Sequence, residues 1–247
     1  MTDRTAALPV QPRGFATAWR GHFWLFDKAH PPSTYGGTAG AVLLLTVVGL
    51  EAARMLLRSM ESPAAPFWLA IPVLLTLALL AVRLLTHLQF TAVGLRPWSS
   101  WNGTERSFFF QVLLISNVLF PVVFAAQLRK VLGEATSLIP TVTVFVPYLV
   151  FGFYQEVLYR GMLQTELVRR WGLVAGILVS NALYTFGPLH YYYFSSGASL
   201  AVPMFAAIFG MGLVFAGIFR RSENLWIVGV MHALGNAYIV TSLGPVR

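Results

Sequence analysis

Long apolar runs separated by short polar stretches make up most of the chain after residue 37. A transmembrane helix needs about 20 predominantly apolar residues, and several of these runs approach or exceed that length. The runs contain few charges, and basic or turn-forming residues lie between them. The pattern predicts an all-α, polytopic integral membrane protein of about seven transmembrane helices. The predicted spans cover residues 39–57, 66–85, 107–127, 138–167, 173–190, 200–219 and 225–242.

Composition supports the membrane interpretation. Hydrophobic residues make up 57% of the 247 residues and charged residues only 11%, whereas charged residues form about a quarter of a typical soluble domain. The net charge of +8 comes largely from basic residues in short loops beside apolar runs, so we expect contacts with lipid headgroups and not with nucleic acid. The absence of cysteine excludes disulfides and thiolate chemistry.

The chain is expected to divide into three regions. Residues 1–37 contain aromatic and basic residues such as Trp19, Arg20 and Trp24, which indicate a cytoplasmic segment at the membrane interface. Residues 38–137 hold the first three spans and residues 138–243 the remaining four. Basic residues are more numerous on the side of the N-terminus, so the positive-inside rule predicts a cytoplasmic N-terminus. The Arg-rich, Lys-poor composition is typical of a bacterial protein, and we expect the inner membrane as its location.

Two pairs of opposite charges lie inside the apolar runs. Glu51 and Arg54 stand three residues apart, and we expect an ion pair at the membrane edge. Glu156 and Arg160 stand four residues apart, so they share one helix face and can pair. Ionisable side chains within a hydrophobic span are costly unless they pair or act in function, so the second pair marks a candidate site.

Two histidines complete the candidate site. His190 lies four residues after Phe186, and His232 lies four residues before Asn236, so each pair is expected on one helix face. A lone histidine near a helix end is usually a packing residue, but two of them with Glu156 on a third helix favour a common buried site. A carboxylate acting on water, with histidine and asparagine donating to an oxyanion, would give hydrolytic chemistry.

A metal site is the alternative chemistry for these residues. Two histidines and a glutamate could bind zinc, but the candidate ligands lie on separate spans and there is no His-Glu-x-x-His motif. We therefore expect no metal and no cofactor.

Three motifs in order resemble the signatures of one family. Gln155-Glu156-x-x-x-Arg160, Phe186-x-x-x-His190 and His232-x-x-x-Asn236 are similar to the motifs of the CPBP family, which comprises the CAAX-processing and bacteriocin-processing intramembrane proteases. The resemblance covers residues 144–240 and implies that residues 138–243 form the catalytic core, with a variable region before it. It implies a glutamic intramembrane endopeptidase that cleaves near the C-terminus of a membrane-associated protein or peptide.

The first motif departs from the family pattern at one position. The family has Glu-Glu-x-x-x-Arg, and Gln155 replaces the first glutamate, which is assigned to activate water. An amide cannot accept that proton, so we expect an impaired enzyme. By resemblance, Phe186 lies on the substrate side. The other implied roles are the general-base position for Gln155, a helix brace for Glu156 and Arg160, water alignment for His190, and an oxyanion hole for His232 and Asn236.

Three explanations of Gln155 stay open from the sequence. The chain is a natural non-catalytic relative, an inactivated Glu→Gln variant, or an enzyme in which Glu156 is the base. The third conflicts with helix geometry, because adjacent positions point about 100° apart and Glu156 is expected to pair with Arg160. The alternative to a protease is a pseudoprotease that binds a peptide or a partner membrane protein. A transporter is disfavoured, since the sequence contains no inverted repeat.

Overall fold

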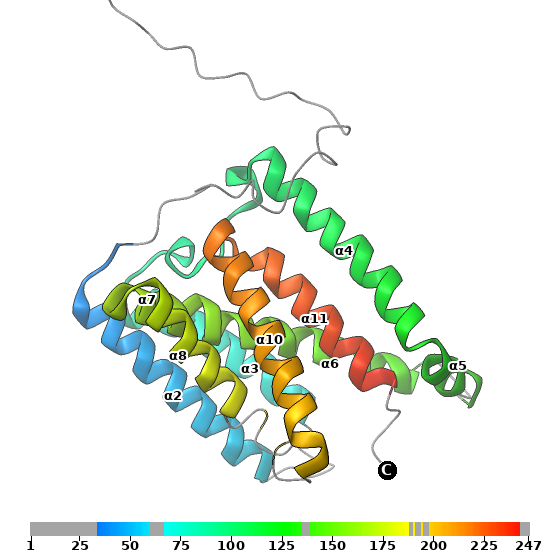
Figure 1. Cartoon of the computed structure of the whole chain (residues 1–247). Helices are drawn as coiled ribbons and strands as arrows, with labels where there is room; N and C mark the ends of the chain where they lie inside the picture. The colour runs from blue at the N-terminus through cyan, green and yellow to red at the C-terminus, as the bar shows by residue number, and fades with distance from the viewer. Residues whose placement is uncertain are drawn as a thin grey trace, which may run out of the picture.

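The computed structural model describes residues 34–59, 67–134, 139–187, 190, 194 and 198–242, and these described residues contain helices and turns but no strand (Figure 1). Most of the expected interfacial segment, residues 1–33, lies outside the described residues. Each of the seven predicted spans is largely helical over its described residues. The helices are α2 (Gly37–Ser59), α3 (Phe67–Leu80), α4 (Gly103–Val123), α5 (Ala125–Glu134), α6 (Ile139–Glu156), α7 (Thr165–Trp171), α8 (Leu173–Phe186), α10 (Ala198–Ser222) and α11 (Leu225–Ser242), with π-helices η1 (Ala81–Leu85) and η4 (Val157–Gln164).

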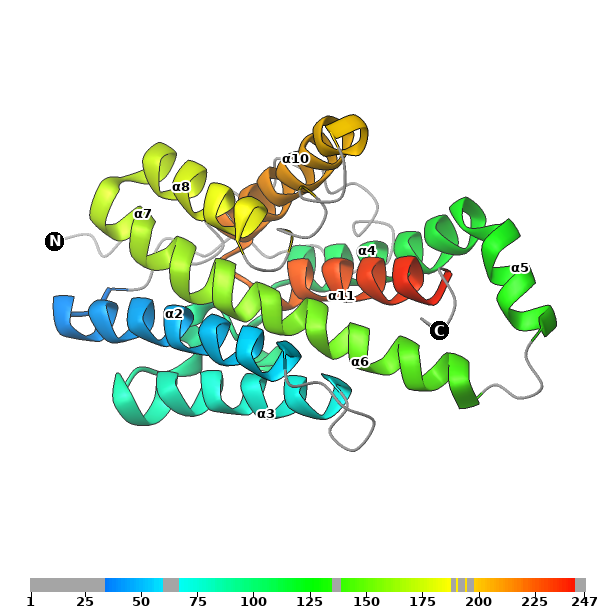
Figure 2. The ribbon, with the colours of Figure 1, turned by 90° about the horizontal axis from the view of Figure 1, so that it is seen from below.

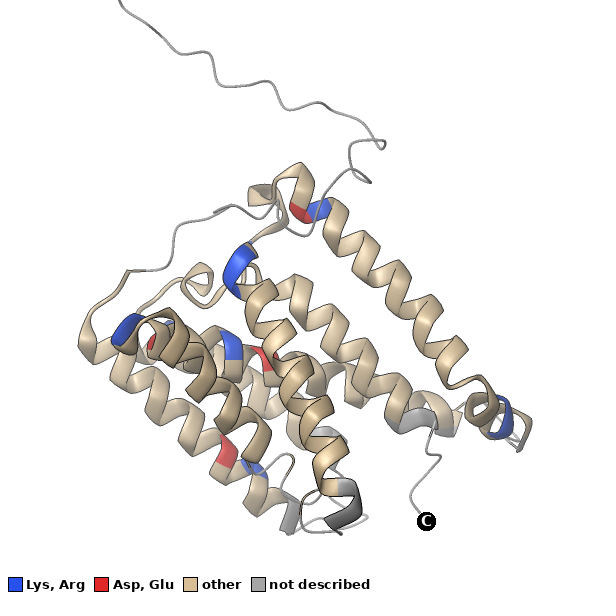
Figure 3. Ribbon diagram, in the orientation of Figure 1, with Lys and Arg blue, Asp and Glu red and all other residues tan. Residues whose placement is uncertain are grey.

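Among the residues that the structure describes, four helical segments are long and apolar enough to cross a membrane. They cover Gly37–Leu57, Gly103–Val123, Thr141–Trp171 and Ala201–Ser222. Three shorter apolar helices accompany them. The protein is therefore an all-helical polytopic membrane protein, as the hydrophobic pattern predicts. Figure 3 shows that most charged residues lie near helix ends, while a few lie inside the bundle.

The longest helical segment crosses the middle of the bundle. Helices α6, η4 and α7 run continuously, and the 31 residues from Thr141 to Trp171 would measure about 46 Å. That exceeds the roughly 30 Å hydrocarbon thickness of a bilayer, so the segment is tilted or extends beyond it. Figure 2 shows it between the pair α2 and α3 on one side and α11 on the other. Its central residues are fully buried, among them Tyr154, Leu158 and Met162.

The crossing of α6 and α11 depends on a small residue. A Cβ atom at Gly152 would lie 2.6 Å from the Cα of Ala233, so only glycine lets the two backbones approach this closely. This approach brings the end of α6 against the middle of α11, which are the elements that carry the first and third motifs.

Helix α4 differs from the predicted third span at both ends. It begins at Gly103 because Asn102 and Glu105 form a capping box, with reciprocal bonds of 2.9 and 2.8 Å. It ends at Val123, and the chain continues as the separate helix α5. The predicted span of about 107 to 127 therefore differs from the helix at both ends. Tyr238 holds α4 against α11 through a 2.9 Å bond to Asn117.

Candidate active site

Two side-chain pairs join the end of α6 to α11. The Nδ2 of Asn236 donates to the Oε1 of Gln155 over 2.7 Å, and the Nδ1 of His232 lies 2.6 Å from the Oε1 of Glu156. Gln155 and Glu156 are both buried, and so is His232. Because His232 and Asn236 are four residues apart, they share one face of α11 as predicted, and this face meets the two neighbouring residues of α6.

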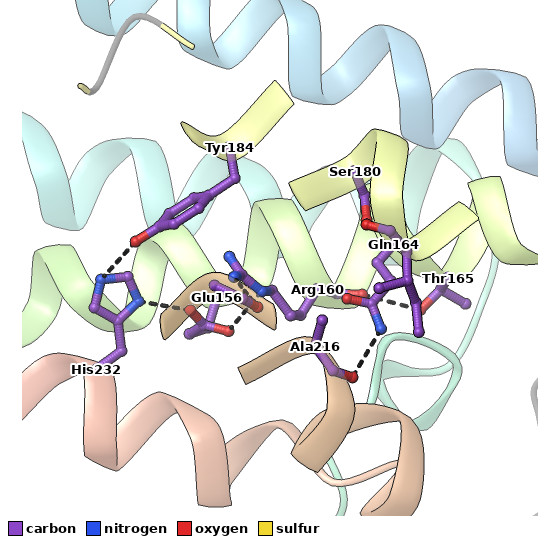
Figure 4. Close-up of polar contacts among 10 residues, drawn as sticks. Glu156, Arg160, Gln164, Thr165, Ser180, Tyr184, Ala216 and His232 are labelled. Atoms are coloured by element: carbon purple, nitrogen blue, oxygen red, sulfur yellow. Dashed lines mark hydrogen bonds and ion pairs between the residues drawn. The ribbon is translucent and has the colours of Figure 1, made fainter. Parts of the chain in front are cut away.

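The Glu156–Arg160 pair also forms as predicted. The Nε of Arg160 lies 3.5 Å from the Oε2 of Glu156, and both side chains are almost completely inaccessible. The Nη2 of Arg160 donates to the Gly212 carbonyl over 3.0 Å, and its guanidinium lies 4.2 Å from the ring centre of Tyr184. A buried arginine needs such compensation for its lost hydration. Figure 4 shows Arg160 beside Glu156, with His232 on the other side of the carboxylate.

Tyr184 is a site residue that the motifs do not include. It lies on α8, and its hydroxyl is 3.3 Å from the Nε2 of His232. Its backbone carbonyl is 2.9 Å from the Nδ1 of His190, whose ring packs edge-on against the Tyr184 ring at 4.8 Å. With Arg160 above the ring as well, Tyr184 contacts residues of all three motifs. A tyrosine in an apolar span is a weak signal for this position, since a buried hydroxyl usually finds a hydrogen-bond partner.

Both ring nitrogens of His232 have polar partners. Nδ1 faces Glu156, Nε2 faces the Tyr184 hydroxyl, and the ring stacks on Phe215 at 5.0 Å. An ionised carboxylate accepts a hydrogen bond from a protonated Nδ1, which leaves Nε2 to accept a hydrogen bond from the Tyr184 hydroxyl. The expected oxyanion-donor role of His232 would require Nε2 to carry the proton and to leave Tyr184.

The second motif is not a continuous helix face, and the prediction that Phe186 and His190 share one is wrong. Helix α8 ends at Phe186, and Gly187 takes an extended conformation with φ −68° and ψ 175°. His190 lies in the following turn, where its amide donates to the Gly187 carbonyl over 3.1 Å. The cause is readable in the sequence, because residues before a proline avoid the helical conformation and Pro188 follows Gly187.

Phe186 is largely exposed. Its side chain is 58% exposed, and its ring stacks on Phe205 of α10 at 5.5 Å. The expected substrate contact of Phe186 stays a prediction.

A row of hydrogen bonds links the site to α10. Three side chains from η4 and α8 donate to backbone carbonyls on one face of that helix. A Cβ atom at Gly212 would overlap Asn181, so this position needs glycine. The bonds join Arg160 to Gly212 (3.0 Å), Gln164 to Ala216 (3.2 Å) and Asn181 to Phe209 (2.9 Å).

The Glu51–Arg54 pair of α2 contacts the helix that carries the first motif. The ion pair forms as predicted, with 3.0 Å between the Nη2 of Arg54 and the Oε2 of Glu51. It is buried among the helices, with exposed fractions of 6% for Glu51 and 1% for Arg54, and its expected place at the membrane edge stays a prediction. The hydroxyl of Tyr154 reaches the Oε1 of Glu51 over 3.4 Å. Tyr154, the residue before Gln155, thus forms a hydrogen bond with α2.

The described residues contain no group of three or more His, Cys, Asp or Glu side chains arranged to hold a metal ion. The chemistry that the site itself offers is that of a carboxylate–imidazole pair, two amides and a tyrosine hydroxyl. Such groups move protons and donate hydrogen bonds, as a hydrolase requires.

Comparison with protein families agrees with the motifs. Residues 135–238 match the family described as type II CAAX prenyl endopeptidase Rce1-like. The matched segment contains all three motifs and extends from the start of α6 into α11. The chain therefore carries a domain of the CAAX protease family, and the predicted family is confirmed. No curated protein and no solved structure matched the chain. Helices α2 to α5 precede the matched segment.

Proposed function

We propose that this protein is an intramembrane endopeptidase of the CAAX type. It cleaves a membrane-associated protein or peptide near the C-terminus by attack of an activated water. The observation that carries this proposal is the buried contact of 2.6 Å between Glu156 and His232, which joins the first motif to the third. Tyr184 lies on α8, the helix on which the second motif begins, and its hydroxyl contacts the other nitrogen of His232. The family name gives prenylated C-terminal peptides as the substrate class to test first.

The glutamine at position 155 limits how this proposal can work. Its side chain accepts a hydrogen bond from Asn236 but cannot take a proton from water. Loss of a general base typically costs about 10²–10⁴-fold in rate. Hydrolysis by this chain is therefore slow, or it uses another base in the same site.

A second candidate function follows from the same residue. A non-catalytic membrane partner would keep the buried polar contacts of the site and bind a peptide or a sister protease without cleaving it. The Gln155–Asn236 amide pair favours this alternative, because two amides stabilise a site without providing a proton acceptor.

Mass spectrometry of peptides that copurify from native membranes tests both candidates. We would compare the natural chain with His232→Ala and with His87→Asn, a control at an exposed histidine distant in sequence from the motifs. A protease yields cleaved peptide with the natural chain and the control, and intact peptide with His232→Ala. Intact peptide on all three proteins supports the binding partner. The absence of peptide on every one of them contradicts both.

A further inference from the structure

The fixed orientation of the His232 ring suggests where the missing base is. We propose that His232, oriented by Glu156, is the general base of this chain, and that Gln155 is a hydrogen-bond donor to the substrate carbonyl. This inference rests on the proposed protease function and assigns its proton transfers. It departs from the roles that the family resemblance implies for these residues.

The carboxylate decides which nitrogen of His232 carries the proton. Glu156 Oε1 lies 2.6 Å from Nδ1, so the proton resides on Nδ1 and the lone pair on Nε2. Arg160 lies 3.5 Å from the other carboxylate oxygen and balances its charge. A carboxylate that holds an imidazole in one tautomer leaves the distal nitrogen ready to accept a proton, and it stabilises the imidazolium that forms.

The surroundings of His232 define where water can approach the lone pair. Phe215 stacks on the ring and covers it with apolar surface. The Tyr184 hydroxyl, 3.3 Å from Nε2, marks the direction of the lone pair. A water that takes or shares this contact would be held by Tyr184 with a hydrogen directed at Nε2.

Gln155 suits the complementary role. Its oxygen already accepts from Asn236, and this bond fixes the amide so that its nitrogen is left to donate. His232 and Asn236 are four residues apart on α11, which places their Cβ atoms about 5–6 Å from each other. Their partners Glu156 and Gln155 therefore meet neighbouring positions of the same helix face. A carboxylate at position 155 would repel a developing oxyanion, whereas an amide nitrogen stabilises it.

His232 Nε2 takes a proton from water while the water oxygen bonds to the scissile carbonyl carbon, and the carbonyl electrons move to its oxygen. Gln155 donates to that oxyanion. When the oxyanion collapses, the C–N bond breaks and the proton on Nε2 passes to the leaving amine. Glu156 stays ionised, and the products are a new C-terminal carboxyl group and a free amine.

The effect of Gln155→Glu separates this inference from a simply missing base. The full chain, reconstituted in lipid nanodiscs, would be assayed with a farnesylated peptide that ends in a Cys-aliphatic-aliphatic-Met sequence. We expect Gln155→Glu to change kcat by less than about 10-fold, or to lower it. We expect Glu156→Gln and His232→Ala to lower kcat by about 10²–10⁴-fold with little change in KM. Gln111→Glu makes the same chemical change on α4 and serves as the control.

Two outcomes would contradict different parts of the argument. A rise in kcat of about 100-fold or more in Gln155→Glu overturns the assignment of His232 as base but leaves the proposed function intact. Absence of cleavage by every protein, Gln155→Glu included, overturns the proposed function and this assignment with it.

A spectroscopic measurement tests the assignment without turnover. The chain has five histidines, so ¹⁵N-histidine NMR of the labelled protein is tractable, with His232→Gln to assign the signal. We expect a protonated Nδ1 and an unprotonated Nε2 for His232 at neutral pH. Glu156→Gln should convert it to a tautomer mixture. A neutral ring that carries its proton on Nε2 would rule out this base.

Discussion

At the scale of single residues, the buried charges determine which substitutions the protein tolerates. Glu51 and Arg54 lie outside the matched family segment, yet they are among the least exposed charged residues described. Glu51→Ala would leave Arg54 buried without its partner, which typically costs about 3–5 kcal/mol. We expect thermal unfolding, followed by tryptophan fluorescence, to show a loss of that order.

The double variant Glu51→Ala/Arg54→Leu should recover most of this stability, because it removes both charges. Arg83→Ala, at an exposed position, should have little effect. Equal losses in the single and double variants would show that the ion pair is not the cause.

Glycine positions on α10 offer a second residue-scale prediction. A Cβ atom at Gly212 would overlap Asn181 and lie 3.2 Å from the Nη2 of Arg160, whereas Gly210 has nothing within 4 Å. Gly212→Ala should therefore displace α10 from these partners and cost about 1–3 kcal/mol, the range for overpacking. Gly210→Ala on the same helix should be neutral or slightly stabilising, since alanine favours helices. Thermal unfolding of both variants checks this, and equal effects would contradict the packing argument.

The residues of the site could be predicted from the sequence to different degrees. Spacing alone predicts that Glu156 pairs with Arg160 and that His232 and Asn236 share a face, because these pairs lie four apart within continuous helices. Tyr184 could not be found this way, since its contacts with His232 and His190 depend on how three helices pack. The contact of His232 with Glu156 also comes from tertiary packing.

At the scale of elements, the hydrophobic pattern predicts where the helices lie but not how they end or bend. The π-helix from Val157 to Gln164 leaves no mark in hydrophobicity, although it carries Arg160 into the site. The end of α8 before Pro188 follows from a local backbone rule that a count of apolar residues does not include.

The crossing of α6 and α11 gives an element-scale prediction. Gly152→Leu would push α6 away from the backbone of Ala233, because even a Cβ atom there would lie 2.6 Å from the Ala233 Cα. The shift would separate Gln155 from Asn236, and a misplacement of about 1 Å can cost 10²-fold in activity. We expect loss of peptide cleavage or binding, whichever the natural chain shows.

Engineered cysteines can measure this displacement directly, since the natural chain has none. The rings of Phe145 on α6 and Tyr238 on α11 lie 5.2 Å apart, so a cysteine at each position should be joined by a short bis-methanethiosulfonate reagent. Gly152→Leu should reduce the crosslinked fraction, and Gly49→Leu on α2, where nothing lies within 4 Å of a Cβ, should not. An unchanged fraction in Gly152→Leu would contradict a displacement of the helices.

At the scale of the whole molecule, helices outside the family segment support the site. Glu51 of α2 accepts a hydrogen bond from Tyr154 of α6, and Asn117 of α4 accepts one from Tyr238 of α11. The two side-chain pairs between α6 and α11 thus lie between helices that the motifs do not predict. Sequence patterns identify the chemistry of the site, while its rigidity depends on these additional contacts.

The distribution of basic residues predicts how the molecule sits in the membrane. Arginines occupy the last turns of α7 and α10. Figure 3 shows another basic position near the start of α4, while the basic residues of α5 lie at the opposite end of the molecule. The positive-inside rule places the first group in the cytoplasm. Ser100→Cys, in the turn before α4, should react with a membrane-impermeant maleimide only when the cytoplasmic face is accessible. Leu132→Cys on α5 should react from outside in intact cells, because it is exposed and lies with the second group. The opposite labelling pattern would contradict the predicted orientation of the protein in the membrane.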